Sequence, residues 1–537
     1  MTRRTPAALV RTPVVGVLLL CAAAAFAPGH LRAQAADGPQ TTAERSGFAA
    51  TSTTADVRAF VDELAALPHG DRLRVEVAGT SEEGRELLLV TAATPMPDAG
   101  TDLRGDARLR ILVNANIHGG EVEGKEVVQA LLREISMGEH GGLLEHAILM
   151  FVPVYNADGN DRIDPRQRVS QNGPVEGVGQ RPNANDLDLN RDFIKAESAE
   201  CRIMLGLFAR HDPHVFIDLH TTNGSEHAYH LTWAPSLSTN VAPALDGFAR
   251  GELLPQVQQR CLEDHEIRTY PYGNLTGRQV RRWITYDHRP RFGTNYYGLR
   301  NRLGILSEAY SYADFETRIR ATRAFTLEVL RGAVEHRATI AALCAAADRA
   351  MEAPDAALYF GHDTTFGPGH EAEVLLSKVD AVQGEHGTRR VMSDIQTPTT
   401  MIVADAFYSR QQIALPEAWW IEAPSTEVLD LLHRHGVRFE RLEAPRAVPV
   451  AAFEIAEYSR SGRPFQGHRE ARVEGQWTAA AKRTLPAGAV RIPARQPLGR
   501  VAAQLLEPQS EDSATTWNFF DAALEGAKTH PVLRQPR

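Results

Sequence analysis

A histidine and a glutamate stand three positions apart in the segment Ile111–Glu126, which reads ILVNANIHGGEVEGKE. They are His118 and Glu121, and they follow an apolar run where a strand is expected to give way to a helix. Zinc binds histidine nitrogen and carboxylate oxygen, and a catalytic zinc site needs three protein ligands with one position left open. The pair could therefore supply two ligands. The alternative is a glycine-rich turn with a solvent-exposed His and Glu, because H-x-x-E patterns often arise by chance.

His220 is the best candidate for a third ligand. It directly ends the apolar strand expected at 215–219, and small polar residues follow it. Because sites in open α/β sheets assemble at the carboxyl ends of strands, we expect the reactive residues that follow other apolar runs to lie beside it. These are His118–Glu121, Asp188–Asp192 and Glu308. A surface histidine is the alternative for His220, and its nearby competitors are His211, His214, His227 and His230.

The elements that must position these residues alternate between apolar runs and amphipathic segments, which is typical of an α/β fold. Strands are predicted at 73–77, 87–90, 108–113, 147–154, 215–219 and 303–306. Helices are predicted at 57–64, 122–135, 196–210, 241–263 with a kink at Pro255, and 314–350. Residues 155–187 lack apolar periodicity, and an insert of that length is usually functional. We predict a mixed, mostly parallel sheet flanked by helices.

The N-terminus has the pattern of a secretory signal peptide over residues 1–35. Arginines precede the apolar run Val14–Phe26, which is too short to span a membrane comfortably, and Ala33–Ala35 supplies an A-x-A cleavage site. An uncleaved anchor is the alternative. We expect a secreted or periplasmic protein with no stable membrane insertion after signal cleavage. The cysteines that remain allow at most one disulfide: Cys201, Cys261 and Cys344.

Length and composition indicate a soluble protein with two domains. The chain has 537 residues, 43% hydrophobic and 23% charged, and its formal net charge is −9. This mildly acidic balance predicts no nucleic-acid partner. We predict a flexible leader at 36–52, a catalytic domain at 53–350 and a smaller β-rich C-terminal accessory domain at 351–537. The second domain has one clear helix, 425–435, followed by a strand at 437–442, and no catalytic constellation.

Five short motifs follow one another along the chain. They are HGGE at 118–121, NADG at 156–159, LDLNRD at 187–192, DLH at 218–220 and SEAY at 307–310. In this order they resemble the zinc carboxypeptidase family of metalloexopeptidases, and together they cover about residues 55–345. The resemblance implies a zinc carboxypeptidase-like catalytic domain in a bacterial secreted member that carries a C-terminal appended domain.

The resemblance implies a role for each metal-site residue. His118, Glu121 and His220 would hold one zinc ion per chain. Glu308 would be the general base that activates a zinc-bound water, whose pKa the metal lowers to about 7. Asp188 would orient His118 by accepting a hydrogen bond from its other ring nitrogen.

The resemblance also implies a substrate, a peptide with a free C-terminal carboxylate. Asn190 and Arg191 match the pair that binds this carboxylate, and a planar guanidinium suits it because it donates two charge-assisted hydrogen bonds. The position that sets side-chain preference falls near Gly293 or Thr294, and neither is an acid. No counter-charge for a C-terminal lysine or arginine is therefore evident.

Two further roles have competing candidates. The family uses an arginine to stabilise the tetrahedral oxyanion, and Arg168 is our preferred choice over Arg162, Arg166 and Arg181. The family also uses a mobile tyrosine that closes over the substrate. Tyr286, which precedes Glu308 by 308 − 286 = 22 positions, is preferred over Tyr296 and Tyr297.

The predicted function is that of a zinc metallocarboxypeptidase, and two alternatives stay open. The first alternative is an enzyme with the same zinc site that cleaves a different bond, such as a cell-wall peptide hydrolase or an amino-acid deacylase. Mass spectrometry of the reaction products would distinguish it from a carboxypeptidase. The other is a non-catalytic, zinc-containing binding protein that acts through its second domain. In that case a Glu308 variant would keep the biological role.

Overall fold

The computed structural model describes residues 38–140, 142–277 and 281–537, so the predicted signal peptide at 1–35 lies outside it. Residues Pro39–Arg537 form one compact unit. Its central eight-stranded sheet has the order β1-β2-β4-β3-β5-β10-β6-β7. The strands are β1 Leu73–Thr80, β2 Glu86–Ala92, β3 Leu109–Ala115, β4 Ala147–Val152, β5 Val215–Thr221, β6 Leu231–Pro235, β7 Thr269–Pro271 and β10 Leu303–Ala309.

The middle of this sheet is parallel. β4, β3, β5 and β10 run in one direction, whereas β1–β2, β2–β4 and β10–β6 are antiparallel pairs. β3, β4 and β5 are buried along their whole length, as expected for apolar strands covered on both faces. The predicted mixed, mostly parallel sheet flanked by helices is confirmed.

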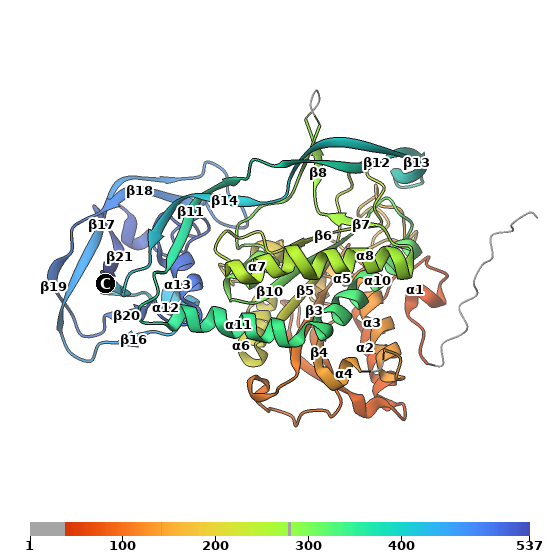
Figure 1. Ribbon diagram of the computed structural model, residues 1–537, viewed down its shortest axis with the longest axis horizontal. Helices are drawn as coiled ribbons and strands as arrows, with labels where there is room; N and C mark the ends of the chain where they lie inside the picture. Colours follow the sequence, from red (N-terminus) through yellow and green to blue (C-terminus); the bar gives the residue numbers. More distant parts are fainter. Residues whose placement is uncertain (1–37, 141, 278–280) are drawn as a thin grey trace, which may run out of the picture. The chain divides into compact units, whose positions relative to one another are not determined.

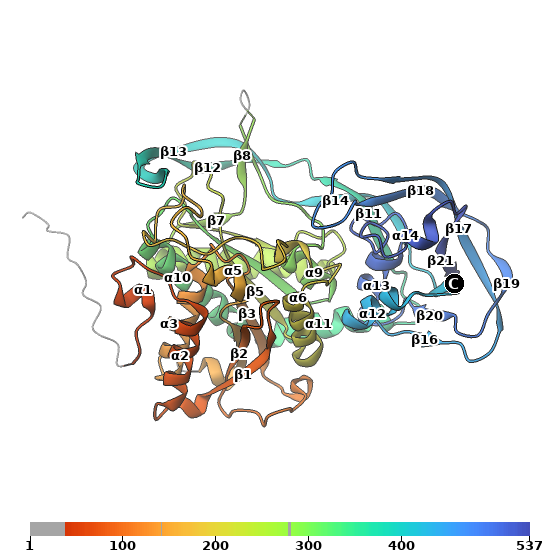
Figure 2. The ribbon, with the colours of Figure 1, turned by 180° about the vertical axis from the view of Figure 1, so that it is seen from behind.

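Helices cover both faces of the sheet. They are α2 Thr54–Ala66, α3 Glu123–Ser136, α4 Leu143–His146, α5 Ala157–Asp161, α6 Ala199–His211, α7 Pro243–Phe248, α8 Leu254–His265, α9 Gly293–Leu299, α10 Phe315–Glu335 and α11 Arg337–Glu352. Figure 1 shows α7, α8, α10 and α11 in front of the central strands, and Figure 2 shows α6 on the opposite side. Side chains of Thr53, Ser198 and Asp314 accept backbone hydrogen bonds at the starts of α2, α6 and α10, which fixes where these helices begin.

Two predicted helices are interrupted in the structure. The helix predicted at 314–350 is divided at His336 into α10 and α11. The helix predicted at 241–263 consists of α7, a π-helical turn at Ala249–Leu253, and α8. Pro255 is the second residue of α8, which follows directly on the π-helical turn.

Residues 39–52 pack against α3. They contain the short helix α1, Thr42–Arg45, and Glu44 accepts two hydrogen bonds of 2.7 Å from Arg133 of α3. Ser52 donates its backbone N–H to Glu126 at 2.7 Å. The segment that we expected to be a flexible leader is therefore tied to the core, because a buried carboxylate and a buried guanidinium need its polar groups.

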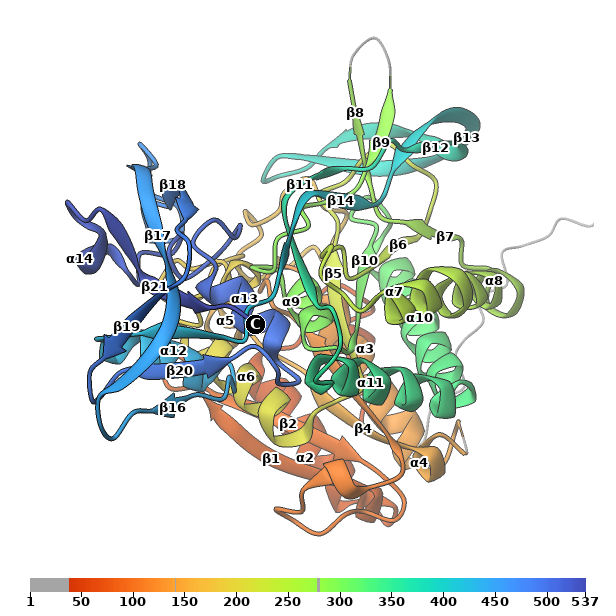
Figure 3. The ribbon, with the colours of Figure 1, turned by 60° about the vertical axis from the view of Figure 1, so that its left-hand side comes forward.

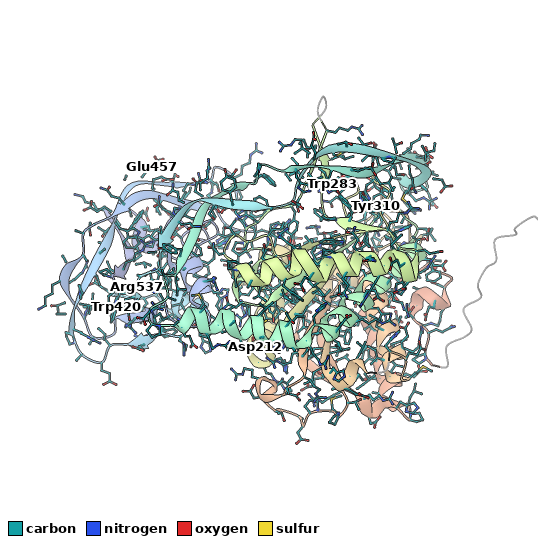
Figure 4. All side chains as sticks on the ribbon, in the orientation of Figure 1. Asp212, Trp283, Tyr310, Trp420, Glu457 and Arg537 are labelled. Carbon is teal, nitrogen blue, oxygen red and sulfur yellow. The ribbon has the colours of Figure 1, made fainter. Side chains whose placement is uncertain are left out.

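The chain after residue 351 is rich in strands, as predicted. β11 Tyr359–Phe366 pairs with β14 Phe407–Ala414, and β12 His370–Gln383 and β13 Thr388–Ala404 form a sheet with β9 Arg282–Ile284 and β8 Asn274–Thr276. Figure 3 shows β12 and β13 beside β8 and β9. Trp283 of β9, labelled in Figure 4, is fully buried and packs in one cluster with Val374 of β12 and Met401 of β13.

The last sheet gathers most of the remaining C-terminal strands. They are β15 Ala418–Ile421, β16 Glu440–Arg441, β17 Arg446–Arg460, β18 Ala471–Trp477, β19 Ala481–Leu485, β20 Val490–Pro493 and β21 Thr529–Gln535, with helices α12 Thr426–Arg434, α13 Gly499–Leu506 and α14 Asp521–Leu524. Trp419 and Trp420 of β15 are buried core residues. The strand predicted at 437–442 is wrong except for β16, because residues 437–439 pair with no strand. The domain boundary near residue 350 stays a prediction.

No helix in the described ranges combines the length and the apolar character needed to cross a bilayer. Cys201, Cys261 and Cys344 are all unpaired and buried.

Buried histidines predict sensitivity to acid. Burial lowers the pKa of His530 from its ordinary value of 6.5 to about 3. Below pH 6.5 the unfolded chain therefore binds a proton that the folded chain does not, and stability falls as the pH falls. His530→Gln is expected to reduce the slope of unfolding free energy against pH by about 1.4 kcal/mol per pH unit between pH 6 and 4. Urea unfolding at several pH values measures this slope. Exposed His69→Gln is the control, and an unchanged slope in His530→Gln would contradict the assignment.

Candidate active site

The ends of three neighbouring strands bring the predicted site residues together. His118 and Glu121 lie in the turn between β3 and α3, His220 lies in β5, and Glu308 lies in β10. The register places Glu308 directly beside His220 on neighbouring parallel strands. The expected clustering at the carboxyl ends of the sheet is thus observed.

The turn that carries His118 and Glu121 depends on close backbone approaches. The Asn116 side chain donates to the carbonyl oxygens of His118 and Glu121, at 3.2 and 3.1 Å. A Cβ atom at Gly119 would lie 2.4 Å from the backbone of Gly159 and 2.6 Å from that of Gln180. Only glycine therefore lets this turn pack against the insert that carries the arginines.

Two imidazoles converge on one carboxylate oxygen. His118 Nδ1 and His220 Nδ1 each lie 3.0 Å from Glu121 Oε2. The three side chains are about 3% exposed or less, and one donor atom from each lies within 4.8 Å of the others. Two histidines and one glutamate form a ligand set that zinc uses in catalytic sites. His118, Glu121 and His220 therefore form a candidate metal site.

A carboxylate oxygen lies close to the second ring nitrogen of each histidine. Asp188 Oδ1 lies 3.0 Å from His118 Nε2, and Asp218 Oδ2 lies 2.9 Å from His220 Nε2. The role of Asp218 was not recognised from the sequence. The signal was present, because residues two apart on a strand share a face and Asp218 precedes His220 by two positions in β5.

The electrostatics of this group fit a bound cation. His118 Nδ1 is buried and forms no hydrogen bond with any residue that the structure describes. Burial alone would raise the pKa of Glu121, but His118, Arg168 and His220 hold it well below its ordinary value. Glu121 is therefore an anion facing an unpaired imidazole nitrogen. A second acidic group, Glu134 with Glu139 and His140, fits less well because Arg323 already donates two hydrogen bonds of 2.7 Å to Glu134.

Glu308 is a buried carboxyl whose pKa is shifted by its surroundings, with burial raising it and the neighbouring His220 opposing that shift. Burial raises its pKa from 4.5 to about 8, and the neighbouring Glu121 acts in the same direction. Its Oε2 is buried and has no hydrogen-bond partner in the described part of the chain.

Two of the four candidate arginines reach the metal site. Arg168 donates from Nη1 to Glu121 Oε1 at 3.0 Å, and Arg181 does so at 3.4 Å. Arg181 also donates from Nε to Asp188 at 3.0 Å. Arg162 and Arg166 pair instead with Glu83 and Asp164. Arg168, the preferred candidate, therefore lies at the metal site, and Arg181 lies there as well.

The predicted carboxylate-binding pair lies beside this group. Asn190 and Arg191 belong to the 3₁₀ turn Leu189–Arg191, which follows Asp188. Asn190 Oδ1 accepts the N–H of Gly293 at 2.8 Å, and the Arg191 guanidinium lies 4.0 Å from the centre of the Phe292 ring. Both side chains are therefore held by the segment that leads into α9.

The three tyrosine candidates separate clearly. Tyr286 packs with Leu306, which lies on the same face of β10 as Glu308, and its hydroxyl lies 2.9 Å from Thr294 Oγ1. Tyr296 and Tyr297 are completely buried, with hydroxyls bonded to His435 Nδ1 and to the Pro213 carbonyl. Only Tyr286 is placed near the candidate base. Neither of the positions predicted to set side-chain preference, Gly293 and Thr294, is an acidic residue.

Comparison with known proteins agrees with this geometry. A family model described as zinc carboxypeptidase matches residues 57–223, which contain the candidate metal ligands. "Probable carboxypeptidase 2" of Trichophyton verrucosum is 28% identical over 142 residues, and "Carboxypeptidase D" of Mus musculus is 30% identical over 132 residues. These alignments cover 26% and 21% of this chain. The chain spans only 24% and 9% of those relatives' lengths.

Solved structures give weaker similarity over a longer stretch. A metallo-carboxypeptidase from Pseudomonas aeruginosa in complex with (2-guanidinoethylmercapto)succinic acid has a TM-score of 0.40 at 17% identity. The alignment covers 54% of this chain and 70% of the Pseudomonas aeruginosa chain. A metallo-carboxypeptidase from Burkholderia cenocepacia aligns with the same two coverages, with a TM-score of 0.39 at 17% identity.

Proposed function

Because residues 57–223 match the zinc carboxypeptidase family, we propose that this chain is a zinc metallocarboxypeptidase that hydrolyses the C-terminal peptide bond of peptides. One observation carries the proposal. His118 Nδ1 and His220 Nδ1 converge on Glu121 Oε2, and Glu308 stands beside His220 in the register of the sheet. The predicted signal peptide leads us to propose further that the enzyme acts outside the cytoplasm.

His118, Glu121 and His220 are the residues that would hold zinc. When bound, zinc supplies a Lewis acid that polarises a carbonyl and lowers the pKa of water to about 7. Glu308 takes the proton of the attacking water and returns it to the leaving amine. Its position beside His220 in the register of the sheet supports this role.

The arginines have two separate roles, one at the scissile carbonyl and one at the terminal carboxylate of the substrate. Arg168 and Arg181 stabilise the negative charge that develops on the scissile carbonyl oxygen, and their contacts with Glu121 support this role. Arg191 and Asn190 bind the substrate's terminal carboxylate. Arg191 suits this role because its nearest carboxylate oxygen, on Asp188, is 3.9 Å away, so its guanidinium is not tied by a short ion pair.

Two matched peptides test the proposal. The zinc-loaded enzyme is expected to remove the last residue of a peptide with a free C-terminus and to leave its C-terminally amidated twin intact, as followed by mass spectrometry. Arg191→Ala is expected to raise KM for the free peptide about 10- to 100-fold, because it removes a charge-assisted hydrogen-bonding group. Arg166→Ala is the control, since Arg166 is 77% exposed and its ion pair is with Asp164.

Three results would count against the proposal. Equal cleavage of both peptides would contradict a carboxypeptidase, and internal cleavage would do the same. An Arg191→Ala enzyme with the KM of the Arg166→Ala control would remove Arg191 from the carboxylate site.

A further inference from the structure

A turn of the β-rich C-terminal region reaches the segment that carries Asn190 and Arg191. Gln466 Oε1 accepts the backbone N–H of Asp188 at 2.8 Å, across 278 positions of sequence. His468, two residues later, lies 2.9 Å from Glu197. We call residues 188–197 the carboxylate-binding segment. Both of its ends are thus tied to the C-terminal region.

The turn that presents Gln466 has an unusual residue at its tip. Phe465 and His468 exchange backbone hydrogen bonds of 2.7 and 3.0 Å, and the two residues between them, Gln466 and Gly467, have φ values of +49° and +81°. Positive φ at both central positions defines a type I′ turn, for which Asn-Gly is strongly preferred. Gln466 adopts a conformation that is unfavourable for it, and such strain persists where surrounding contacts over-determine it. Its side chain is one methylene longer than asparagine and reaches Asp188.

Asp188 connects this contact to both halves of the site. One carboxylate oxygen lies 3.0 Å from His118 Nε2 and accepts the N–H of Asn190, also at 3.0 Å. The other accepts a 3.0 Å hydrogen bond from Arg181. The backbone position of Asp188 therefore sets the ring orientation of His118 and the start of the Asn190–Arg191 turn at once.

Further contacts with the C-terminal region hold Arg291, the residue that precedes Phe292. Arg291 is buried, donates its backbone N–H to Asp512 at 2.9 Å, and pairs with Glu470 at 2.6 Å. Its guanidinium also lies 4.7 Å from the centre of the Trp517 ring. The next residue, Phe292, is the one on which the Arg191 guanidinium rests.

We propose that the C-terminal region completes the carboxylate-binding site, with Gln466 as a positioning residue for Asp188 and, through it, for Asn190 and Arg191. The proposal rests on the proposed function for its kinetic consequence. The structural consequence does not depend on the proposed function, because Gln466 protects the Asp188 amide from exchange whether or not the protein is a carboxypeptidase.

Two variants remove the contact and keep the turn. Gln466→Asn gives the preferred Asn-Gly pair with a side chain too short to reach Asp188, and Gln466→Gly removes the side chain at a position that suits glycine. Gln466→Glu keeps an acceptor oxygen at the original reach. The control is Gln509→Ala, because in the described part of the chain the Gln509 side chain bonds Glu474 and no residue of the carboxylate-binding segment.

Hydrogen exchange of peptides that cover residues 185–193 measures positioning without any assay of activity. We expect Gln466→Asn and Gln466→Gly to speed exchange of this segment about 3- to 10-fold, at an unchanged melting temperature. With zinc-loaded enzyme, we expect KM for the free-carboxylate peptide to rise about 3- to 10-fold with a smaller change in kcat. Gln466→Glu, which keeps the acceptor oxygen, should retain the wild-type exchange rate.

The outcomes separate the two proposals. Wild-type exchange and wild-type KM in both contact-removing variants would overturn the positioning role. Faster exchange with an unchanged KM would also overturn it, because the segment would then move without affecting the substrate. If the wild-type zinc-loaded enzyme releases no C-terminal residue, the proposed function fails, and the exchange rates still decide whether Gln466 holds Asp188.

Discussion

Replacing Glu308 by glutamine is expected to lower kcat/KM for a free-carboxylate peptide by about 10²- to 10⁴-fold, which is the range for losing a general base. Glutamine keeps the shape of the buried side chain but cannot take a proton from water. The KM should change little, because Glu308 is not among the residues that bind the terminal carboxylate. Initial rates over a range of peptide concentrations, at equal zinc occupancy, measure both parameters.

The matched control is Glu316→Gln, which changes an exposed glutamate in the first turn of α10. Zinc content should equal that of the wild type in both variants, since Glu308 is not one of the three converging ligands. A Glu308→Gln enzyme with full activity would reject the general-base role. A Glu308→Gln enzyme that loses its zinc would instead show that this residue belongs to the metal site.

Removing one ligand is expected to have an equally large effect by a different route. His220→Ala leaves only His118 and Glu121 to bind zinc and leaves the buried Asp218 without its histidine. We expect zinc to be lost on dialysis and activity to fall below detection. Asp218→Asn, which removes only support for the histidine, is expected to weaken zinc binding about 10- to 100-fold.

Zinc content after dialysis and the melting temperature with and without added zinc distinguish these variants. A ligand that binds only the folded state raises its stability, so zinc should raise the melting temperature of the wild type and of the exposed-histidine control His69→Ala. It should not raise that of His220→Ala. Stoichiometric zinc in His220→Ala would contradict the assignment of this histidine.

The metal site was predictable from the sequence because local patterns place it. Apolar runs predicted β3, β5 and β10, and the strand-end rule then predicted that His118, His220 and Glu308 would meet. The observed strands extend somewhat further than predicted, so that His220 and Glu308 lie within β5 and β10. Pairing with β6 extends β10, since Glu308 lies opposite Thr232 and Ala309 opposite Leu231.

The arginines and tyrosines were harder to place because their segments lack periodicity. Nothing in residues 155–187 predicts which arginine turns inward, and the structure brings both Arg168 and Arg181 to Glu121. For the tyrosines the deciding feature is α9, whose burial takes Tyr296 and Tyr297 into the core. The short helix Gly293–Leu299 was not expected, so the three tyrosines could not be separated.

Gln466 was beyond prediction for a different reason. Its contact with Asp188 joins residues far apart in sequence, and no local pattern marks a side chain for a long-range hydrogen bond. The turn residues Gln466 and Gly467 give the only hint, since glutamine is rare where φ must be positive.

X-ray diffraction from crystals of the zinc-loaded protein, measured on both sides of the zinc absorption edge, tests the central claim most directly. We expect one anomalous peak among His118 Nδ1, Glu121 and His220 Nδ1, at about 2.0–2.1 Å from each nitrogen. A peak at Glu134 and His140 instead, or no peak among the three proposed ligands, would contradict the assignment of this site.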